Sequence, residues 1–231
     1  MVWSDITPAE WAAELQELAK AAGKKIKTKL IYATQCFDSY NAIINPFGGS
    51  YPEASFDGFP VYKKLLEYIR LGGLFVNVAD IPTYWAYNPR LQRMLDRTPA
   101  VYGMAGGEVR FFHRVPLMQE LGLRVRNVEK LGSPPWPPVW PVQMAPRYRG
   151  CSTSIATLLA SRAVIVEGNV EAVIEPTKVG EDHMTPLFFC HYGEGRCLIS
   201  LSFLNGGYSS NSPLKGMISK LVIHQLTNRR S

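Results

Sequence analysis

The sequence has few charged residues and no long apolar stretch. Charged residues make up 19% of its 231 residues, whereas apolar residues make up 46%, which is enough for a sizeable core. It contains no run of about eighteen apolar residues, and this excludes a membrane-spanning helix. Residues 1–5 have neither the basic region nor the apolar run of a secretory signal. We therefore expect no membrane partner.

The sequence also lacks the usual spacings of metal ligands. Its cysteines form no Cys-x-x-Cys pair and its histidines form no His-x-x-x-His pair, so we predict no metal site. The glycine-rich residues 103–107 lack the lysine of a phosphate-binding loop, so we predict no cofactor. Without a disulfide pattern we expect a reduced, cytoplasmic setting. Export as part of a longer protein is the alternative.

Positive charge is in excess but scattered. The net charge is +6, from 25 Lys and Arg against 19 Asp and Glu, and the densest positive run is Lys24, Lys25, Lys27 and Lys29. A nucleic-acid patch would need aromatic or glycine-rich neighbours, and none lies beside this run. We interpret the run as a solvated helix end leading into a strand, and we expect no nucleic-acid partner.

Apolar periodicity predicts alternating helices and strands in the N-terminal third. Pro8 begins one helix, and a second follows from about residue 60. Short apolar runs at residues 30–33, 42–45 and 74–78 predict strands. This alternation favours an α/β fold, a three-layer sandwich with a mostly parallel central sheet and helices on both faces. We expect one domain over residues 1–231, either complete or a segment of a longer protein.

An added β-hairpin region is predicted in the C-terminal third. Residues 163–166 and 170–174 flank one turn, and residues 187–192 and 196–201 flank another, Gly-Glu-Gly. A three-residue loop in the second hairpin places Cys190 opposite Leu198 and on the other face of the sheet from Cys197. We therefore predict no disulfide between these two cysteines.

A proline-rich segment, residues 134–141, contains two tryptophans. Proline cannot donate to a sheet ladder, so we predict an extended surface loop. We expect the tryptophans to pack onto the domain; an interface or a ligand wall is the alternative.

Two segments resemble the class I glutamine amidotransferase-like superfamily, which has a flavodoxin-like α/β fold. In residues 40–50 an apolar strand ends in Pro-Phe-Gly-Gly-Ser. The resemblance implies that Gly48 and Gly49 lie where backbone N–H groups of the superfamily bind an oxyanion. In residues 72–82 a glycine pair and an apolar strand lead to the turn that carries the superfamily's nucleophile. Ala79 or Asp80 falls at that place, and neither is a cysteine or a serine.

Residues 191–201 are similar to the late region of non-catalytic relatives, namely trehalose-utilisation-like proteins and the trimerisation domain of β-galactosidases. The stretch that follows, residues 202–206, falls where the superfamily has its triad histidine and acid. It contains neither, and Asn205 lies within it. The resemblance thus implies a scaffold without its catalytic machinery.

We therefore predict a non-catalytic binding or assembly module of unknown ligand, with other domains of a longer chain or a second copy as partners. Asp80 either contacts the ligand or caps a short helix. One alternative is a hydrolase or amidase that acts on a small polar substrate through Cys36 or Ser50, although an ordinary loop cysteine also explains Cys36. Another is a small-molecule sensor that uses the relic cleft. The predicted lining of that cleft is Gly48, Gly49, Ser50, Ala79, Asp80 and Asn205.

Overall fold

The computed structural model describes residues 8–31, 36–46, 50–52, 61–79, 81–82, 85–88, 93–95, 116–128, 138–202 and 213–228. The helices within these ranges are α1 (Pro8–Ala21), α2 (Val61–Arg70), α4 (Pro116–Glu120), α5 (Pro213–Asn228) and the 3₁₀ helix η3 (Pro146–Cys151).

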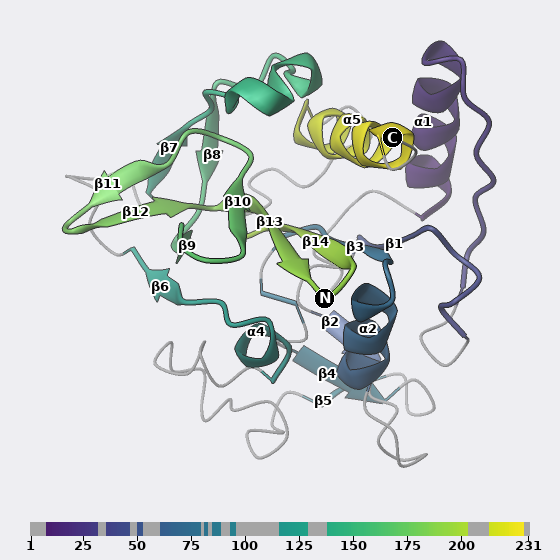
Figure 1. The fold of residues 1–231 in the computed structure, drawn as a ribbon, viewed down its shortest axis with the longest axis horizontal. Helices are drawn as coiled ribbons and strands as arrows, with labels where there is room; N and C mark the ends of the chain where they lie inside the picture. Colours follow the sequence, from purple (N-terminus) through teal and green to yellow (C-terminus); the bar gives the residue numbers. More distant parts are fainter. Residues whose placement is uncertain are drawn as a thin grey trace.

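A five-stranded sheet forms the centre of the fold (Figure 1). Its strands are, in spatial order, β1 (Ala42–Asn45), β3 (Leu74–Asn77), β14 (Gly195–Ser200), β13 (Leu187–Tyr192) and β10 (Val170–Ala172). Strands β1, β3 and β14 are parallel to one another, whereas β13 and β10 are antiparallel to their neighbours. The sheet is therefore mixed, because a hairpin joins β13 to β14 within it, and the expected mostly parallel sheet is not confirmed.

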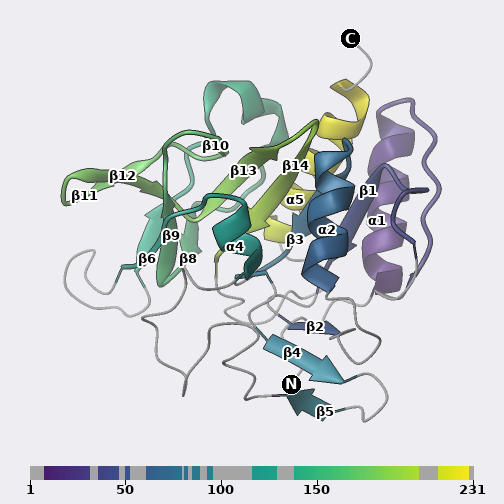
Figure 2. The same cartoon turned by 60° about the horizontal axis from the view of Figure 1, so that its bottom comes forward.

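Helices cover both faces of this sheet (Figures 1 and 2). Successive side chains of a strand point to opposite faces. Accordingly, Leu74 and Val76 of β3 pack into a cluster with α1 and α5, whereas Phe75 packs into a second cluster with α2 and α4. Both clusters extend into the C-terminal β region, so the two faces of one sheet organise the whole core.

Three smaller sheets complete the described structure. An antiparallel sheet contains β11 (Thr177–Val179), β12 (Asp182–Thr185), β9 (Arg162–Ile165) and β6 (Val125–Asn127). A two-stranded sheet pairs β7 (Val139–Pro141) with β8 (Thr157–Leu159). A mixed sheet contains β2 (Ser50–Pro52), β4 (Trp85–Asn88) and β5 (Arg93–Leu95).

The glycine pair before β3 serves close packing. A side chain on Gly73 would collide with the ring of Tyr68, and Gly72 has a φ of 102°. The Tyr68 hydroxyl donates to the carbonyl oxygen of Leu74 at 3.3 Å. Glycine at both positions therefore lets α2 turn directly into β3.

The strand expected at residues 30–33 does not form over its described part. Leu30 and Ile31 lie outside any strand, and residues 32 and 33 lie outside the described residues. Leu30 is 66% exposed, so it supplies little of the burial that an apolar run predicted.

The hairpin expected from residues 163–166 and 170–174 is also wrong. Strand β9 pairs with β12 and β6, whereas β10 pairs with β13 in the central sheet. The turn between them therefore joins two sheets instead of closing a hairpin, a choice that depends on partners distant in sequence.

The second hairpin forms, but its register differs by one residue from the predicted one. Tyr192 pairs with Gly195, so the loop has two residues and Cys190 lies opposite Cys197. Gly195 is part of the strand, and a side chain at this position would collide with the carbonyl oxygens of Ile69 and Gly73. Both cysteines are free, as predicted. They are register partners, however, so the predicted placement on opposite faces of the sheet was wrong. Burial raises the pKa of the Cys190 thiol to about 12.

The proline-rich segment ends in strand β7, and its described tryptophan is buried. Trp140 is 1% exposed, and its Nε1 donates to the carbonyl oxygen of Ala160 at 2.8 Å. Trp136 lies outside the described residues. Packing of Trp140 onto the domain is thus confirmed.

Candidate functional site

The carboxyl ends of the parallel strands β1 and β3 carry the polar residues nearest the predicted cleft. Ala79 is described and buried, and Ser50 begins β2. Four other predicted cleft residues lie outside the described residues: Gly48, Gly49, Asp80 and Asn205. The described part of the candidate site therefore consists of the carboxyl ends of these strands.

Two asparagines meet where β1 and β3 end. Asn45 and Asn77 are register partners, because the parallel strands end together. The Asn45 Nδ2 donates to the Asn77 Oδ1 at 3.1 Å, and the Asn77 Nδ2 donates to the carbonyl oxygen of Ala79 at 3.0 Å. Asn77 is fully buried. A buried amide is stable only when its polar atoms are paired, and here the pairing ties both strand ends to the turn that follows.

The chain turns sharply at Ala79. This residue has a φ of 65°, in the left-handed region. No other non-glycine residue of the described chain has a positive φ. An L-residue in that region costs about 1–2 kcal/mol relative to the ordinary conformations. The bond from Asn77 to the Ala79 carbonyl helps to hold this conformation. Strained backbone of this kind gathers at ligand sites, although the Ala79 side chain is only a methyl group.

A pair of hydroxyl groups lies at the end of the third parallel strand, β14. Ser200 and Ser202 are both buried, and their Oγ atoms are 2.6 Å apart. Ile199 is the register partner of Asn77, so Ser200 faces the α1 and α5 side of the sheet and the asparagines face the other side. The described carboxyl edge thus carries amides and hydroxyls, but no charged side chain. Open α/β sheets bind ligands at this edge.

The sequence pattern did not single out Asn45, Asn77 or Ser200. A signal existed, since each is the polar last residue of an apolar strand. Such residues are also common as simple strand terminators, so only the pairing of the strands reveals that they meet.

Cys36 stands apart from this edge. It is exposed, and its Sγ donates to the Asp38 Oδ2 at 3.2 Å. Reactive thiols have a cationic or histidine neighbour, and no such contact of Cys36 is seen within the described residues. Among the described residues, the structure thus places a carboxylate next to this thiol, and neither a histidine nor a cation.

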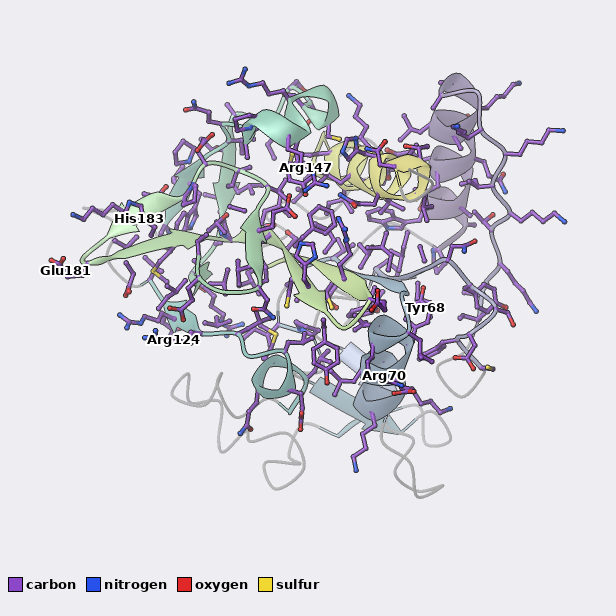
Figure 3. All side chains as sticks on the ribbon, viewed as in Figure 1. Tyr68, Arg70, Arg124, Arg147, Glu181 and His183 are labelled. Carbon is purple, nitrogen blue, oxygen red and sulfur yellow. The ribbon has the colours of Figure 1, made fainter. Side chains whose placement is uncertain are left out.

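A charged cluster lies at the β10 edge of the sheet, the edge opposite β1. The Glu171 carboxylate accepts hydrogen bonds from the Tyr148 hydroxyl at 2.6 Å, from the Arg147 guanidinium at 3.0 Å and from the His191 ring at 3.0 Å. Figure 3 shows Arg147 beside η3 and α5, well away from Tyr68 and Arg70 on α2. The ring of Tyr148 also stacks on Phe189, with centroids 5.5 Å apart.

The pKa values in this cluster follow from its contacts. Burial acts to raise the pKa of Glu171, but the hydrogen bonds from Tyr148 and His191 outweigh burial and hold it below its ordinary value. Burial, followed by the bond to Glu171, raises the pKa of Tyr148. The carboxylate is therefore ionised and satisfied by its donors, which is the arrangement of a structural ion cluster.

Within the described ranges, no group of three or more His, Cys, Asp or Glu side chains is placed to hold a metal ion. Among the described helices, none combines the length and the apolar character needed to cross a bilayer.

No protein-family model matches the sequence, and no curated protein matches it. Among solved structures, the fold is similar to part of the β-galactosidase from Bacillus circulans sp. alkalophilus, with a TM-score of 0.52 and 13% identity. That likeness covers 94% of this chain and 26% of the galactosidase chain, so this chain spans about a quarter of that enzyme's length.

Two weaker likenesses have lower TM-scores. The mmIFT52 N-terminal domain gives a TM-score of 0.48 at 17% identity, covering 100% of this chain and 96% of that one. A ThuA-like protein from Bacteroides uniformis ATCC 8492 gives 0.43 at 11% identity, covering 92% and 83%. At such identities structural likeness shows the fold alone.

Proposed function

We propose that this chain is a non-catalytic binding or assembly module on an amidotransferase-like scaffold, and that the carboxyl ends of β1 and β3 bind a small polar ligand. The observation that carries the proposal is the turn at Ala79. Its backbone has a φ of 65°, yet its side chain offers no group that a base can activate. A turn that keeps a strained backbone without a nucleophile suits binding and not covalent catalysis.

The ligand class follows from the groups at this edge. The partly buried Asn45 presents an amide, which both donates and accepts hydrogen bonds and carries no net charge, and the buried Asn77 holds it in place. We propose that Gly48 and Gly49 add backbone N–H donors and that Ser50, Asp80 and Asn205 add side-chain contacts. A neutral polar ligand, such as a carboxamide or a sugar with free hydroxyls, fits this set.

The assembly part of the proposal comes from the galactosidase likeness. There the similar fold makes up 26% of a longer chain. We propose that this chain likewise works beside other domains or as a homo-oligomer. A sensor would use the same ligand site and differ only in passing the binding event to a partner.

The hydrolase alternative depends on Cys36 or Ser50. Activation of Cys36 requires a nearby base or cation, and the described contact of its Sγ is with Asp38. An oxyanion hole without a nucleophile leaves only a small part of the rate of a triad enzyme. The geometry of Cys36 therefore favours an ordinary surface thiol.

Release of ammonia from glutamine by the purified chain separates these functions. We expect no release above the protein-free background, and no change on Cys36→Ala. The matched control is Asp38→Asn, which keeps the Cys36 thiol but changes the side chain that it contacts. Turnover that disappears in Cys36→Ala would overturn the proposal and establish the hydrolase.

A further inference from the structure

The segment that follows α1, residues 24–31, runs back along that helix on the surface (Figures 1 and 2). The Gln16 Nε2 donates to the Thr28 Oγ1 at 2.7 Å, which fixes the segment against α1. Ile26 packs against the core cluster of α1 and α5, and Ile31 packs against the other cluster. The segment is therefore held in place at several points along its length.

The exposure of its side chains alternates from Lys25 to Lys29, and Leu30 beyond them is 66% exposed. Lys25, Lys27 and Lys29 are exposed, whereas Ile26 and Thr28 are partly buried. This period of two is that of an extended strand with one face on the protein. Three lysines thus form a row on the outer face, with neighbours about 6.6 Å apart.

No strand among the described residues pairs with the backbone of this segment. Its first N–H, that of Lys24, donates to the carbonyl oxygen of Ala19 at 2.8 Å. From residue 25 to residue 31, no backbone hydrogen bond to another described residue is present. Unpaired N–H and C=O groups along an extended segment form a ready template for a further strand.

The lysine row also has no acidic partner among the described residues. No ion pair of Lys24, Lys25, Lys27 or Lys29 occurs within the described part of the chain. The same charges repel a second copy of the segment, which is the known effect of lysines on exposed strand edges. They attract a strand of opposite charge for the same reason.

We propose that residues 25–31 bind an extended acidic peptide, which adds to this segment as a β-strand. The backbone groups of the peptide pair with those of the segment, and its alternate Asp or Glu side chains pair with Lys25, Lys27 and Lys29. Nucleic acid fits less well, because stacking platforms for bases are aromatic and this segment contains no aromatic residue. The proposed site is independent of the ligand site at the carboxyl edge.

The first test is fluorescence anisotropy with a labelled peptide of alternating Glu and Val. We expect binding that weakens as salt rises, and a loss of affinity of about fivefold in the Lys27→Gln, Lys29→Gln double variant. The matched control is the double variant Lys63→Gln, Lys178→Gln, which removes the same charge from exposed lysines on α2 and β11. Equal loss in both double variants would overturn the site.

Hydrogen exchange separates strand addition from simple attraction of charge. Amides of residues 25–31 should exchange quickly in the free chain and slow markedly when the Glu-Val peptide is bound. A duplex DNA of equal charge should leave them unprotected. Peptide binding without protection at residues 25–31, or equal protection by DNA, would contradict the proposal.

Discussion

Two regions of the central sheet use polar residues in opposite ways. At the β10 edge, Glu171 carries a charge and is surrounded by Tyr148, Arg147 and His191. At the carboxyl ends of β1 and β3, the described groups are neutral, and the backbone at Ala79 is strained. Both regions have buried polar atoms, but only the first neutralises a charge.

The difference separates a stabilising cluster from a candidate binding edge. A carboxylate with three donors is saturated and gains little from a ligand. A strained turn beside neutral amides costs stability in the folded protein, and such costs persist mainly where a site needs the geometry. We therefore assign a stabilising role to the Glu171 cluster and ligand binding to the carboxyl ends of β1 and β3.

The largest expected effect comes from breaking the amide pair at the binding edge. Asn77→Leu keeps the branching and the number of side-chain heavy atoms but leaves the Asn45 amide and the Ala79 carbonyl without the partner that Asn77 supplied. We expect a loss of about 3 kcal/mol in the free energy of unfolding, measured in urea. The control is Asn127→Leu at the end of β6, where a change within about 1 kcal/mol is expected. Equal losses at both positions would show that the Asn77 amide has no special role.

The Glu171 cluster should be nearly as sensitive to substitution. Glu171→Gln removes the charge that Tyr148, Arg147 and His191 share, and hydrogen bonds to a charged group contribute about 1.5–3 kcal/mol. We expect a loss of about 2 kcal/mol at neutral pH. Glu167→Gln is the control, because its pair with Arg124 is exposed and should contribute less than about 0.5 kcal/mol. A Glu171→Gln variant as stable as the wild type would remove the stabilising role from this cluster.

The pH dependence of that loss sharpens the assignment. The pKa of Glu171 lies lower in the folded chain than in the unfolded chain, where it is about 4.3. Its contribution to stability is therefore complete above the unfolded value and is lost as the pH falls through the folded value. We expect the difference in unfolding free energy between wild type and Glu171→Gln to be constant from neutral pH to about pH 5 and to shrink in stronger acid. A difference that persists unchanged to about pH 2 would contradict this linkage.

The smallest effect tests the strain at the binding edge. Ala163→Gly, in buried strand β9, should cost about 1.5 kcal/mol from the lost methyl group and the added chain freedom. Ala79→Gly incurs the same losses but relieves the left-handed strain, so its cost should be close to zero. Urea unfolding of the two variants in parallel gives the comparison. A cost at position 79 equal to that at position 163 would mean that the turn is not strained.

Local pattern was enough to predict some elements of the fold. The apolar runs at β1 and β3 and the periodicity of α1 and α2 mark strands and amphipathic helices at the right places. The pairing of β3 with β14 was beyond reach, because it joins residues far apart in sequence. The register of the last hairpin was predicted wrongly by one residue for the same reason. Gly195 packs against Ile69 and Gly73, which are distant in sequence.

The candidate site was only partly accessible to sequence reasoning. The resemblance pointed to the turn after β3 and thus to Ala79. It missed Asn45 and Asn77, whose importance depends on the strands lying side by side. It also missed the Glu171 cluster, because η3 supplies Arg147 and Tyr148, β13 supplies His191, and no sequence motif joins them to Glu171.

Mapping of small polar ligands by NMR tests the central claim most directly. A panel of carboxamides and monosaccharides would be titrated into the isotope-labelled chain while the backbone amide shifts are followed. A binding edge at the carboxyl ends predicts saturable shifts at Asn45, Asn77 and Ala79, with those of Arg147 and Glu171 unchanged, and a loss of the response in Asn77→Leu. Saturable shifts confined to Arg147, Glu171 and the rest of their cluster would contradict the account.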